Sequence, residues 1–300
     1  MAGSSRALAA AFPSGDYFVE GSAQTRQGRT NYTQLNGPTA AQVNVINALA
    51  EVHTQADLAA GKLRVTASIQ PVGSDAIAFG HAAWADTIEF SVPDGFNCPI
   101  GLYLTGGFSL NPAIPAAWQQ LGGRLTLYVW NSPSGLTPQN ADTLSGSAII
   151  ARDIVFHPGQ PLPQVSASIA VPPGTSDFDI YARLEAGGPG IGATGSFIAD
   201  FGNSANLYID SPTPFISRSG ALLTAAAEQG TPSLTILDTG TNAVKVCWPA
   251  PSSGWVLQQN SALGTTNWVN APLTPVIEDT NKCVTISLPT GNDFYRLLRP

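Results

Sequence analysis

Short stretches in which apolar and polar residues alternate recur along the chain. In the clearest, residues 42–58, every second position from Ile46 to Leu58 is apolar or small, and the positions between are mostly polar. A helical spacing can also be drawn through this segment, but the alternation is longer and cleaner. Residues 59–61 then resemble a turn into a returning strand at 63–69. We therefore predict strands, not a helix, in this region.

Further short runs rich in β-branched and aromatic residues follow, separated by turn sequences such as Pro93-Asp94-Gly95 and Pro172-Pro173-Gly174. Strands at this spacing, with no more than one helical turn expected at 115–121, are typical of antiparallel sheets packed face to face. We predict an all-β, jelly-roll-like sandwich. Its further strands are expected at 76–84, 86–92, 100–104, 124–130, 147–156, 164–171, 178–185, 195–201 and 205–210.

The pattern divides the chain into three parts. Residues 1–37 are rich in Gly, Ser, Gln and Arg, and apart from a short strand at 16–20 we expect an N-terminal arm or edge strand. The sandwich spans 38–228 and ends where a segment without large apolar residues runs into Gly230-Thr231-Pro232. Residues 232–300 form a second, smaller β-sandwich-like module, with strands expected at 234–237, 243–248, 254–259, 283–288 and 294–298.

Charged residues are scarce. Asp, Glu, Lys and Arg make up 11% of the chain, against roughly 25% in typical domains, and neutral polar residues take their place. The net charge of −7 argues against a nucleic-acid partner, because such proteins need a basic face to displace counterions. No apolar run approaches the roughly 20 residues of a transmembrane segment. The first twelve residues are too short for the apolar core of a signal peptide, so an exported protein is expected to have lost its signal.

The three cysteines, Cys98, Cys247 and Cys283, have no spacing that resembles a zinc site. Cys247 and Cys283 lie in two separate expected strands of the small module, and two interpretations remain. They form a disulfide that stabilises the module by about 3–4 kcal/mol, or all three are buried thiols that pack as small apolar residues.

Few residues are available for catalysis, since the chain has three histidines: His53, His81 and His157. We place His53 on the polar face of a strand and His157 in a His-Pro-Gly turn. An enzyme would need a cleft that collects groups such as His81 with Asp86, and no Gly-x-Ser-x-Gly turn precedes a helix. We therefore expect a non-enzymatic protein.

Asp177 and Asp179 flank Phe178, so on a strand both carboxylates face the same side. Paired carboxylates can serve glycoside hydrolysis or bind calcium, but two solvated carboxylates at a strand start are the simpler interpretation. We expect no cofactor, because Ca²⁺ binding is supported by no specific motif.

Six tryptophans offer flat faces on which sugar rings can stack. Core packing is expected for four of them, Trp84, Trp130, Trp248 and Trp268. Trp118, in an expected loop, and Trp255, at the start of a strand, are the candidates for binding a glycan.

The small module has a specific order of motifs. It includes Trp248-Pro249-Ala250-Pro251, Gly254-Trp255-Val256-Leu257, Thr265-Thr266-Asn267-Trp268 and Asn292-Asp293-Phe294-Tyr295-Arg296. In this it resembles a β-rich module at the carboxy-terminal end of many secreted bacterial proteins. The resemblance implies export and attachment or sorting at the cell surface, and no catalytic residue.

The larger part, at residues 57–63, 84–88 and 199–207, more loosely resembles secreted β-sandwich proteins whose relatives carry a PEP-CTERM sorting tail. This chain ends in Arg299-Pro300 without a Pro-Glu-Pro motif, which puts that route of processing in doubt.

These observations predict a secreted or cell-surface protein with a structural or adhesive role. A surface poor in charge avoids the cost of desolvating ions when chains pack together. We expect a subunit that self-assembles into a filament or similar structure, with copies of itself or other surface proteins as partners, and an arm that adds a strand to a neighbour's sheet. The alternative is a carbohydrate-binding module, or an accessory domain of a polysaccharide-degrading system, with glycans as ligands.

Overall fold

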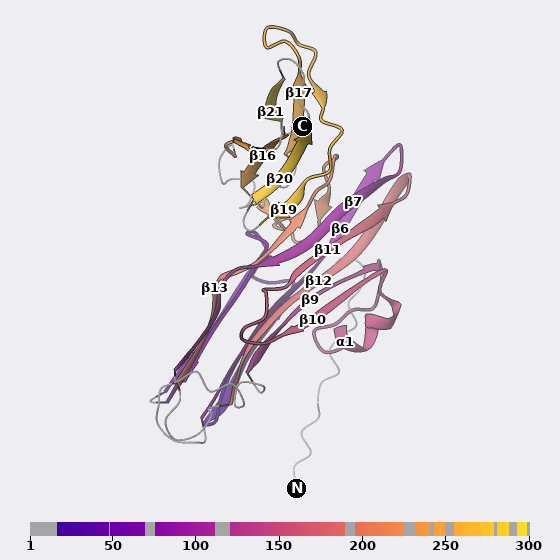
Figure 1. Ribbon diagram of the computed structural model, residues 1–300. Coiled ribbons are helices and arrows are strands. Elements are labelled where there is room, and N and C mark those ends of the chain that lie inside the picture. Colours follow the sequence, from indigo (N-terminus) through magenta and orange to yellow (C-terminus); the bar gives the residue numbers. More distant parts are fainter. Residues whose placement is uncertain are drawn as a thin grey trace.

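The computed structural model describes residues 17–47, 49–69, 76–111, 121–189, 196–224, 232–240, 243–249, 255–278, 281–287 and 293–298. Two antiparallel sheets lie face to face as a long sandwich, and a smaller β module lies at one end (Figure 1). The prediction of an all-β, jelly-roll-like sandwich followed by a second module is confirmed. Most of the helical turn predicted at 115–121, and most of the predicted boundary at 225–232, lie outside the described residues.

The first sheet, sheet A, has the strand order β10-β9-β12-β6-β1-β2, with β14 beside β6. Its long central strands β6 and β12 pair along their whole length of 16 residues. The strands of sheet A are β1 (Phe18–Thr25), β2 (Gly28–Leu35), β6 (Ile77–Val92), β9 (Gly122–Asn131), β10 (Ile150–Phe156), β12 (Gly174–Pro189) and β14 (Ile216–Ser217).

The second sheet, sheet B, has the order β11-β7-β13-β5-β4-β3, with β8 beside β13. Successive strands alternate between the sheets from β5 to β7 and from β10 to β13, as in jelly-roll sandwiches. The strands of sheet B are β3 (Ala40–Ile46), β4 (Ala50–Asp57), β5 (Lys62–Ile69), β7 (Phe96–Leu104), β8 (Gly107–Asn111), β11 (Gln164–Val171) and β13 (Ser196–Ile209).

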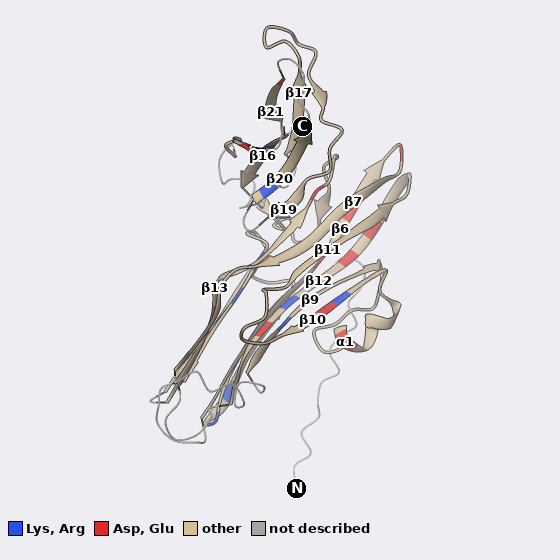
Figure 2. Cartoon of the chain, viewed as in Figure 1, with Lys and Arg blue, Asp and Glu red and all other residues tan. Residues whose placement is uncertain are grey.

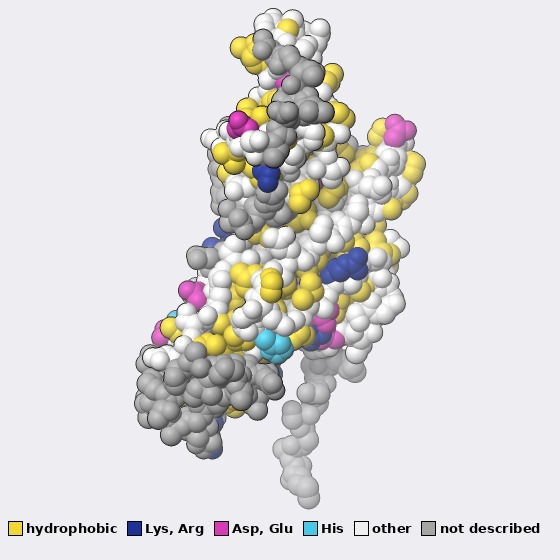
Figure 3. All heavy atoms as spheres, in the orientation of Figure 1, with side chains coloured by type: hydrophobic (Ala, Val, Ile, Leu, Met, Phe, Trp, Pro, Cys, Tyr) yellow, Lys and Arg dark blue, Asp and Glu magenta, His cyan; other side chains and the backbone are white. Residues whose placement is uncertain are grey.

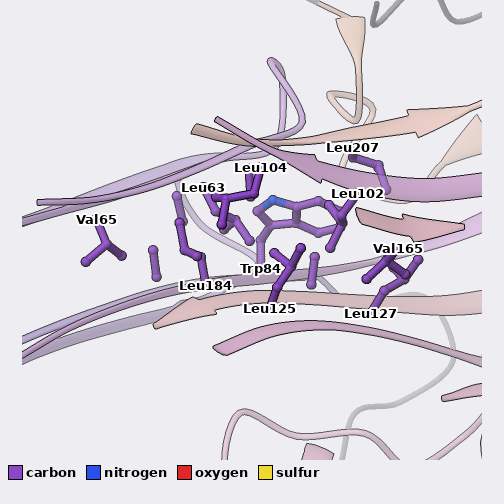
Figure 4. Packing of buried hydrophobic residues seen from close by; sticks show 14 of the residues in the cluster. Leu63, Val65, Trp84, Leu102, Leu104, Leu125, Leu127, Val165, Leu184 and Leu207 are labelled. Carbon is purple, nitrogen blue, oxygen red and sulfur yellow. The ribbon is translucent and has the colours of Figure 1, made fainter. Parts of the chain in front are cut away.

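The core lies between the two sheets and is centred on Trp84. Alternate residues of each strand point into it, because successive side chains of a strand face opposite sides. Figure 4 shows the Trp84 ring between Leu63 and Leu102 of sheet B and Leu125 and Leu184 of sheet A, and all five side chains are fully buried. Burying each side chain of this size stabilises the fold by about 1.5–3 kcal/mol.

Several strands are longer or shorter than predicted. The strands expected at 76–84 and 86–92 are one strand, β6, and those at 195–201 and 205–210 are joined in β13 by a bulge between Phe201 and Ala205. The run at 42–58 is extended as predicted, but it is two strands. They separate near Asn47, whose Oδ1 accepts the backbone N–H groups of Leu49 and Ala50, both at 2.9 Å.

The N-terminal part is built into sheet A. β1 pairs on one side with β6 and on the other with β2, and Phe18 and Val19 are fully buried. The expectation of an arm is therefore corrected for residues 18–35, whereas β2 does lie at the edge of the sheet. The polar sequence of β2 concealed this strand, because an edge strand needs few apolar residues.

The connection between β9 and β10 folds over the outer face of sheet A, as Figure 1 shows for α1 (Ala141–Leu144) beside these strands. A short 3₁₀ turn, Ser145–Ser147, follows, so β10 begins later than the predicted residue 147. Trp130 Nε1 donates a hydrogen bond to the carbonyl of Leu144 at 3.0 Å. Leu136 and Ala141 of the connection pack there in a second apolar cluster with Phe18, Ala83, Ala85, Tyr128, Trp130 and Tyr181.

The module consists of two small sheets around Val246, Trp248, Leu257 and Val284. Cys247 lies directly opposite Cys283 in the pairing of β16 and β20, and the two form a disulfide, which confirms that interpretation. Its strands are β15 (Thr235–Asp238), β16 (Ala243–Pro249), β17 (Val256–Asn260), β18 (Val269–Asn270), β19 (Val276–Glu278), β20 (Asn281–Ser287) and β21 (Phe294–Leu298).

Candidate functional site on the outer face of sheet A

The outer face of sheet A gathers ionisable side chains that are otherwise scarce. Figure 2 shows acidic and basic residues on β6, β12, β9 and β10 within a chain that is mostly neutral. The alternation of β12 explains this placement. Its residues Ile180 and Leu184 point into the core, so Asp179, Arg183 and Glu185 point outward.

His81 lies between two carboxylates on this face. The strand register places His81 of β6 opposite Glu185 of β12. His81 Nδ1 donates to Glu185 Oε1 at 3.0 Å, and His81 Nε2 lies 3.6 Å from Glu20 Oε1 of β1. Burial raises the pKa of Glu20. Burial also acts to raise the pKa of Glu185, but the hydrogen bond from His81 and the charge of Arg183 lower it overall.

Arg183 ties the β9–β10 connection to the sheet. Its side chain is only 6% exposed, and its Nη1 and Nη2 donate to the two carboxylate oxygens of Asp142 in α1 at 3.0 and 2.8 Å. Beside it, Arg124 Nε donates to Asp153 Oδ1 at 2.7 Å. The hydrogen bonds from these guanidinium groups lower the pKa values of Asp142 and Asp153. Both guanidinium groups are thus paired with carboxylates.

We predicted that Asp177 and Asp179 are both solvated, but Asp179 is fully buried and both of its carboxylate oxygens accept hydrogen bonds. Its Oδ1 accepts the hydroxyl of Thr87 at 2.8 Å, and its Oδ2 accepts the backbone N–H and the hydroxyl of Ser134 at 2.8 and 2.6 Å. The prediction missed this burial because the connection that carries Ser134 covers the strand from 45 residues away in sequence. Asp179 therefore anchors the connection.

A trough of about 670 Å³ lies at one end of this charged face. Its lining includes Gly122 of β9 and Gly187 of β12, which pair with each other. Phe79 and Val155 line it, and Glu185 brings one of the paired carboxylates to it. Small-molecule sites have volumes of about 300–1,000 Å³ and are mostly apolar with a few polar groups, so the trough can hold an apolar or amphiphilic group.

Among the described residues, the structure does not bring the candidate pair His81 and Asp86 together. His81 points outward from β6, whereas Asp86 points to the core side, where it accepts the backbone N–H of Thr87 at 2.8 Å. His53 contacts Asn44 and Glu51 on sheet B. His157 Nδ1 donates to the carbonyl of Leu121 at 2.9 Å.

Three of the four tryptophans expected in the core are buried: Trp84, Trp130 and Trp248. The expectation was wrong for Trp268, which is only partly buried. The guanidinium of Arg296 lies 4.4 Å from its ring centroid. Of the two candidates for glycan binding, Trp255 is partly buried before β17, and Trp118 lies outside the described residues.

The spacing of two charged residues on β12 is a sequence signal for this charged face. Arg183 and Glu185 are two positions apart in a strongly apolar strand, so they face one side together. Their partners Glu20, Asp142 and His81 come from distant segments, and only the sheet register shows that they meet.

Among the residues that the structure describes, no three His, Cys, Asp or Glu side chains are arranged to hold a metal ion. Within the same residues, no helix has the length and apolar character needed to cross a membrane. The sequence matches no protein-family model and no curated protein.

Proposed function

We propose that the protein is a secreted or cell-surface structural or adhesive protein that acts without catalysis, as a subunit assembling with copies of itself or with other surface proteins. The proposed extracellular location is supported by the Cys247–Cys283 disulfide, which links two directly paired residues of β16 and β20. Disulfides persist in oxidising compartments and are rare in the cytosol. The third cysteine, Cys98, is buried in the core as a free thiol.

The surface supports assembly. Figure 3 shows a face made mostly of neutral and hydrophobic atoms with few charged side chains. Two strands at sheet edges carry exposed apolar residues, Ile46 on β3 at 67% and Val155 on β10 at 61%. An edge strand with unpaired N–H and C=O groups can pair with another chain, and a surface with few charges loses little hydration free energy when it is covered.

The compartment is tested by counting free thiols in the unfolded protein after expression in its natural host. We expect one reactive thiol per chain, that of Cys98, rising to three after reduction. Three thiols without reduction, together with recovery from the cytosol, would refute the extracellular role.

Assembly is tested by light scattering over a range of protein concentrations. We expect particles larger than a monomer, and a shift to the monomer in the edge variants Ile46→Lys and Val155→Lys. Leu263→Lys is the matched control, because Leu263 is equally exposed at 65% but lies in a loop of the module. A monomer at every concentration would contradict the assembly.

Glycan binding is the second candidate function. It is favoured by a cleft of about 420 Å³ between sheet B and the module, where the exposed side chains of Gln164 and Ser166 offer an amide and a hydroxyl.

A further inference from the structure

One small sheet of the module presents an exposed arginine without an acidic partner. Its strands lie in the order β18-β17-β21, and Figure 1 shows β17 and β21 on the side of the module away from the sandwich. Arg296 of β21 is exposed, and within the part of the chain that the structure describes no carboxylate pairs with it. Arg124 and Arg183 on sheet A, by contrast, are both paired with carboxylates.

A buried glutamine holds the Arg296 guanidinium in place. The strand register sets Gln258 of β17 opposite Arg296 on one side and opposite Asn270 of β18 on the other. Arg296 Nε and Nη2 donate to Gln258 Oε1 at 3.0 and 2.8 Å, and Gln258 Nε2 donates to Asn270 Oδ1 at 3.1 Å. Gln258 is only 8% exposed. Both ends of this buried amide are used, so its orientation and that of the guanidinium are fixed together.

The ring of Trp268 supports the same guanidinium. Cζ of Arg296 lies 4.4 Å from the ring centroid, well inside the roughly 6 Å of a cation–π contact. A guanidinium is planar and weakly hydrated, which suits it to the face of an aromatic ring. With Gln258 and Trp268 both in contact, the arginine has little rotamer freedom left to lose when a ligand binds.

The hydrogen bonds to Gln258 leave the end of the guanidinium available. A guanidinium carries five N–H donors in a rigid fork. Gln258 takes the donor on Nε and one on Nη2, so two donors on Nη1 and one on Nη2 remain. One hydrogen of Nη1 and one of Nη2 point the same way at the end of the side chain. Such a parallel pair of donors binds both oxygens of a carboxylate.

The module does not repel an acidic ligand through its net charge. Residues 232–300 contain four acidic and four basic residues, so the net charge of −7 comes from residues 1–231. In physiological salt, exposed charges more than about 8 Å away are largely screened. The local groups therefore decide what binds at Arg296.

The neighbours of Arg296 favour a sugar acid over an acidic protein side chain. Asn270, Gln258 and Arg296 form a polar row across all three strands, whereas the centre of a protein–protein interface is depleted of charged residues. Asn270 is exposed, and within the described residues only its Oδ1 is engaged. Its NH₂ group can donate to a hydroxyl, and a uronic acid carries hydroxyls next to its carboxylate.

We infer that this face of the module binds a uronic acid unit of an acidic polysaccharide. Arg296 binds the carboxylate through Nη1 and Nη2, and Asn270 donates to a hydroxyl of the same chain. Gln258 and Trp268 position the arginine. The inference rests on the proposed extracellular role, since such polysaccharides are met there, but it does not depend on assembly.

The test uses the full chain on an array of oligosaccharides built from several uronic acids, with carboxyl-reduced counterparts, sulfated oligosaccharides and acidic peptides. Members that bind are then titrated by calorimetry. We expect binding to uronic acid oligomers and its loss when their carboxylates are reduced to alcohols. Affinity should also fall as salt is added, because the ion pair is exposed.

Variants of Arg296 test the assignment of the site. Arg296→Gln should weaken binding by more than about tenfold, the effect of losing a charged hydrogen-bond partner. Arg296→Lys keeps the charge but lacks the planar fork, so it should also weaken binding several-fold. Arg152→Gln is the matched control, because Arg152 is an exposed arginine on β10 of the sandwich; its affinity should be unchanged.

An array without uronic acid ligands, or equal binding of the carboxyl-reduced oligomers, would overturn the inference. So would binding to sulfated oligosaccharides or acidic peptides alone, or unchanged affinity of Arg296→Gln. Calorimetric unfolding of each variant shows whether the module is still folded, and if Arg296→Gln is not, Arg296→Lys decides the result. The thiol count is independent of these results, so a failed polysaccharide site and a failed extracellular role are distinguishable.

Discussion

Asp86 of β6 and Ser219, which follows β14, are joined by two hydrogen bonds across 133 positions of sequence. The backbone N–H of Ser219 donates to Asp86 Oδ1 at 3.1 Å, and the hydroxyl donates to Oδ2 at 2.5 Å. Four residues later, the N–H of Leu223 donates to the carbonyl of Leu58 at 3.0 Å, in the turn between β4 and β5. The segment after β13 thus connects the two sheets, and Asp86 is its anchor on sheet A.

Removal of the Ser219 hydroxyl should destabilise the sandwich. Ser219→Ala leaves Asp86 Oδ2 fully buried without its hydroxyl donor, which costs about 1–3 kcal/mol. Urea unfolding checks the result, with Ser168→Ala as the control because Ser168 is exposed on an edge strand. Equal urea midpoints for the two variants would show that the Ser219–Asp86 hydrogen bond contributes nothing to stability.

Asp86 should make stability depend on pH between about 4 and 6. Burial raises its pKa from 3.8 to about 6, although hydrogen bonds from Ser219 and Thr87 act to lower it. The folded protein therefore keeps this proton to a higher pH than the unfolded chain does. Stability falls as the pH rises through this window, by about 3 kcal/mol in total, and changes no further above it.

Asp86→Asn should flatten the pH profile in that window, because asparagine does not titrate. The measurement is the free energy of unfolding of both proteins from pH 4 to 7. Asp142 and Asp153 have lowered pKa values, so they act in the opposite direction and below about pH 4. The burial-raised pKa of Glu20 contributes equally to both proteins. Parallel profiles would contradict the assignment to Asp86.

Reduction of the disulfide should destabilise the module more than the sandwich. The bond closes a loop with a sequence separation of 36, which corresponds to about 3–4 kcal/mol in the chain-entropy model. Calorimetry with and without reductant should show one transition move to lower temperature while the sandwich transition stays. A Cys98→Ala variant is the control that should respond to reductant in the same way. A sandwich transition that shifts by as much would show that the two units do not unfold separately.

The free thiol should be inert in the folded protein. Burial raises the pKa of Cys98 to about 12, so almost no thiolate is present at neutral pH. Iodoacetamide at pH 8 is expected to leave native Cys98 unmodified and to alkylate it after unfolding in urea, as mass spectrometry of the digested protein would show. Rapid modification of the native protein would mean that the core around Cys98 opens.

Loss of the Asp142 carboxylate should loosen the connection over sheet A. Asp142→Ala leaves the buried guanidinium of Arg183 with the Thr126 hydroxyl and with Glu185 Oε1 at 4.0 Å, but without its two hydrogen bonds to a carboxylate. We expect a loss of about 1–3 kcal/mol. Asp94→Ala removes an acidic residue from an exposed turn and should change stability by less than about 0.5 kcal/mol. Hydrogen exchange around residues 141–148 should increase in the Asp142 variant alone.

Local pattern was enough to predict most strands. The alternation at 42–58 and the β-branched run at 164–171 favour an extended backbone, and the structure has the strands β3 and β4 in the first segment and β11 in the second. The pattern did not predict strand β2, which is held in the sheet by backbone pairing with β1. β2 is polar because it needs only the partner β1, and its lack of an apolar face made it look like an arm.

The sequence by itself determined that this protein is built of antiparallel strands, because side-chain alternation and turn residues act over a few positions. Only the tertiary structure decided which strands meet. It set Cys247 opposite Cys283, placed His81 beside Glu185, and brought Lys282 of the module to Asp210 of the sandwich. These pairs depend on sheet register and domain docking, which sum many weak contacts between distant segments and leave no local pattern in the chain.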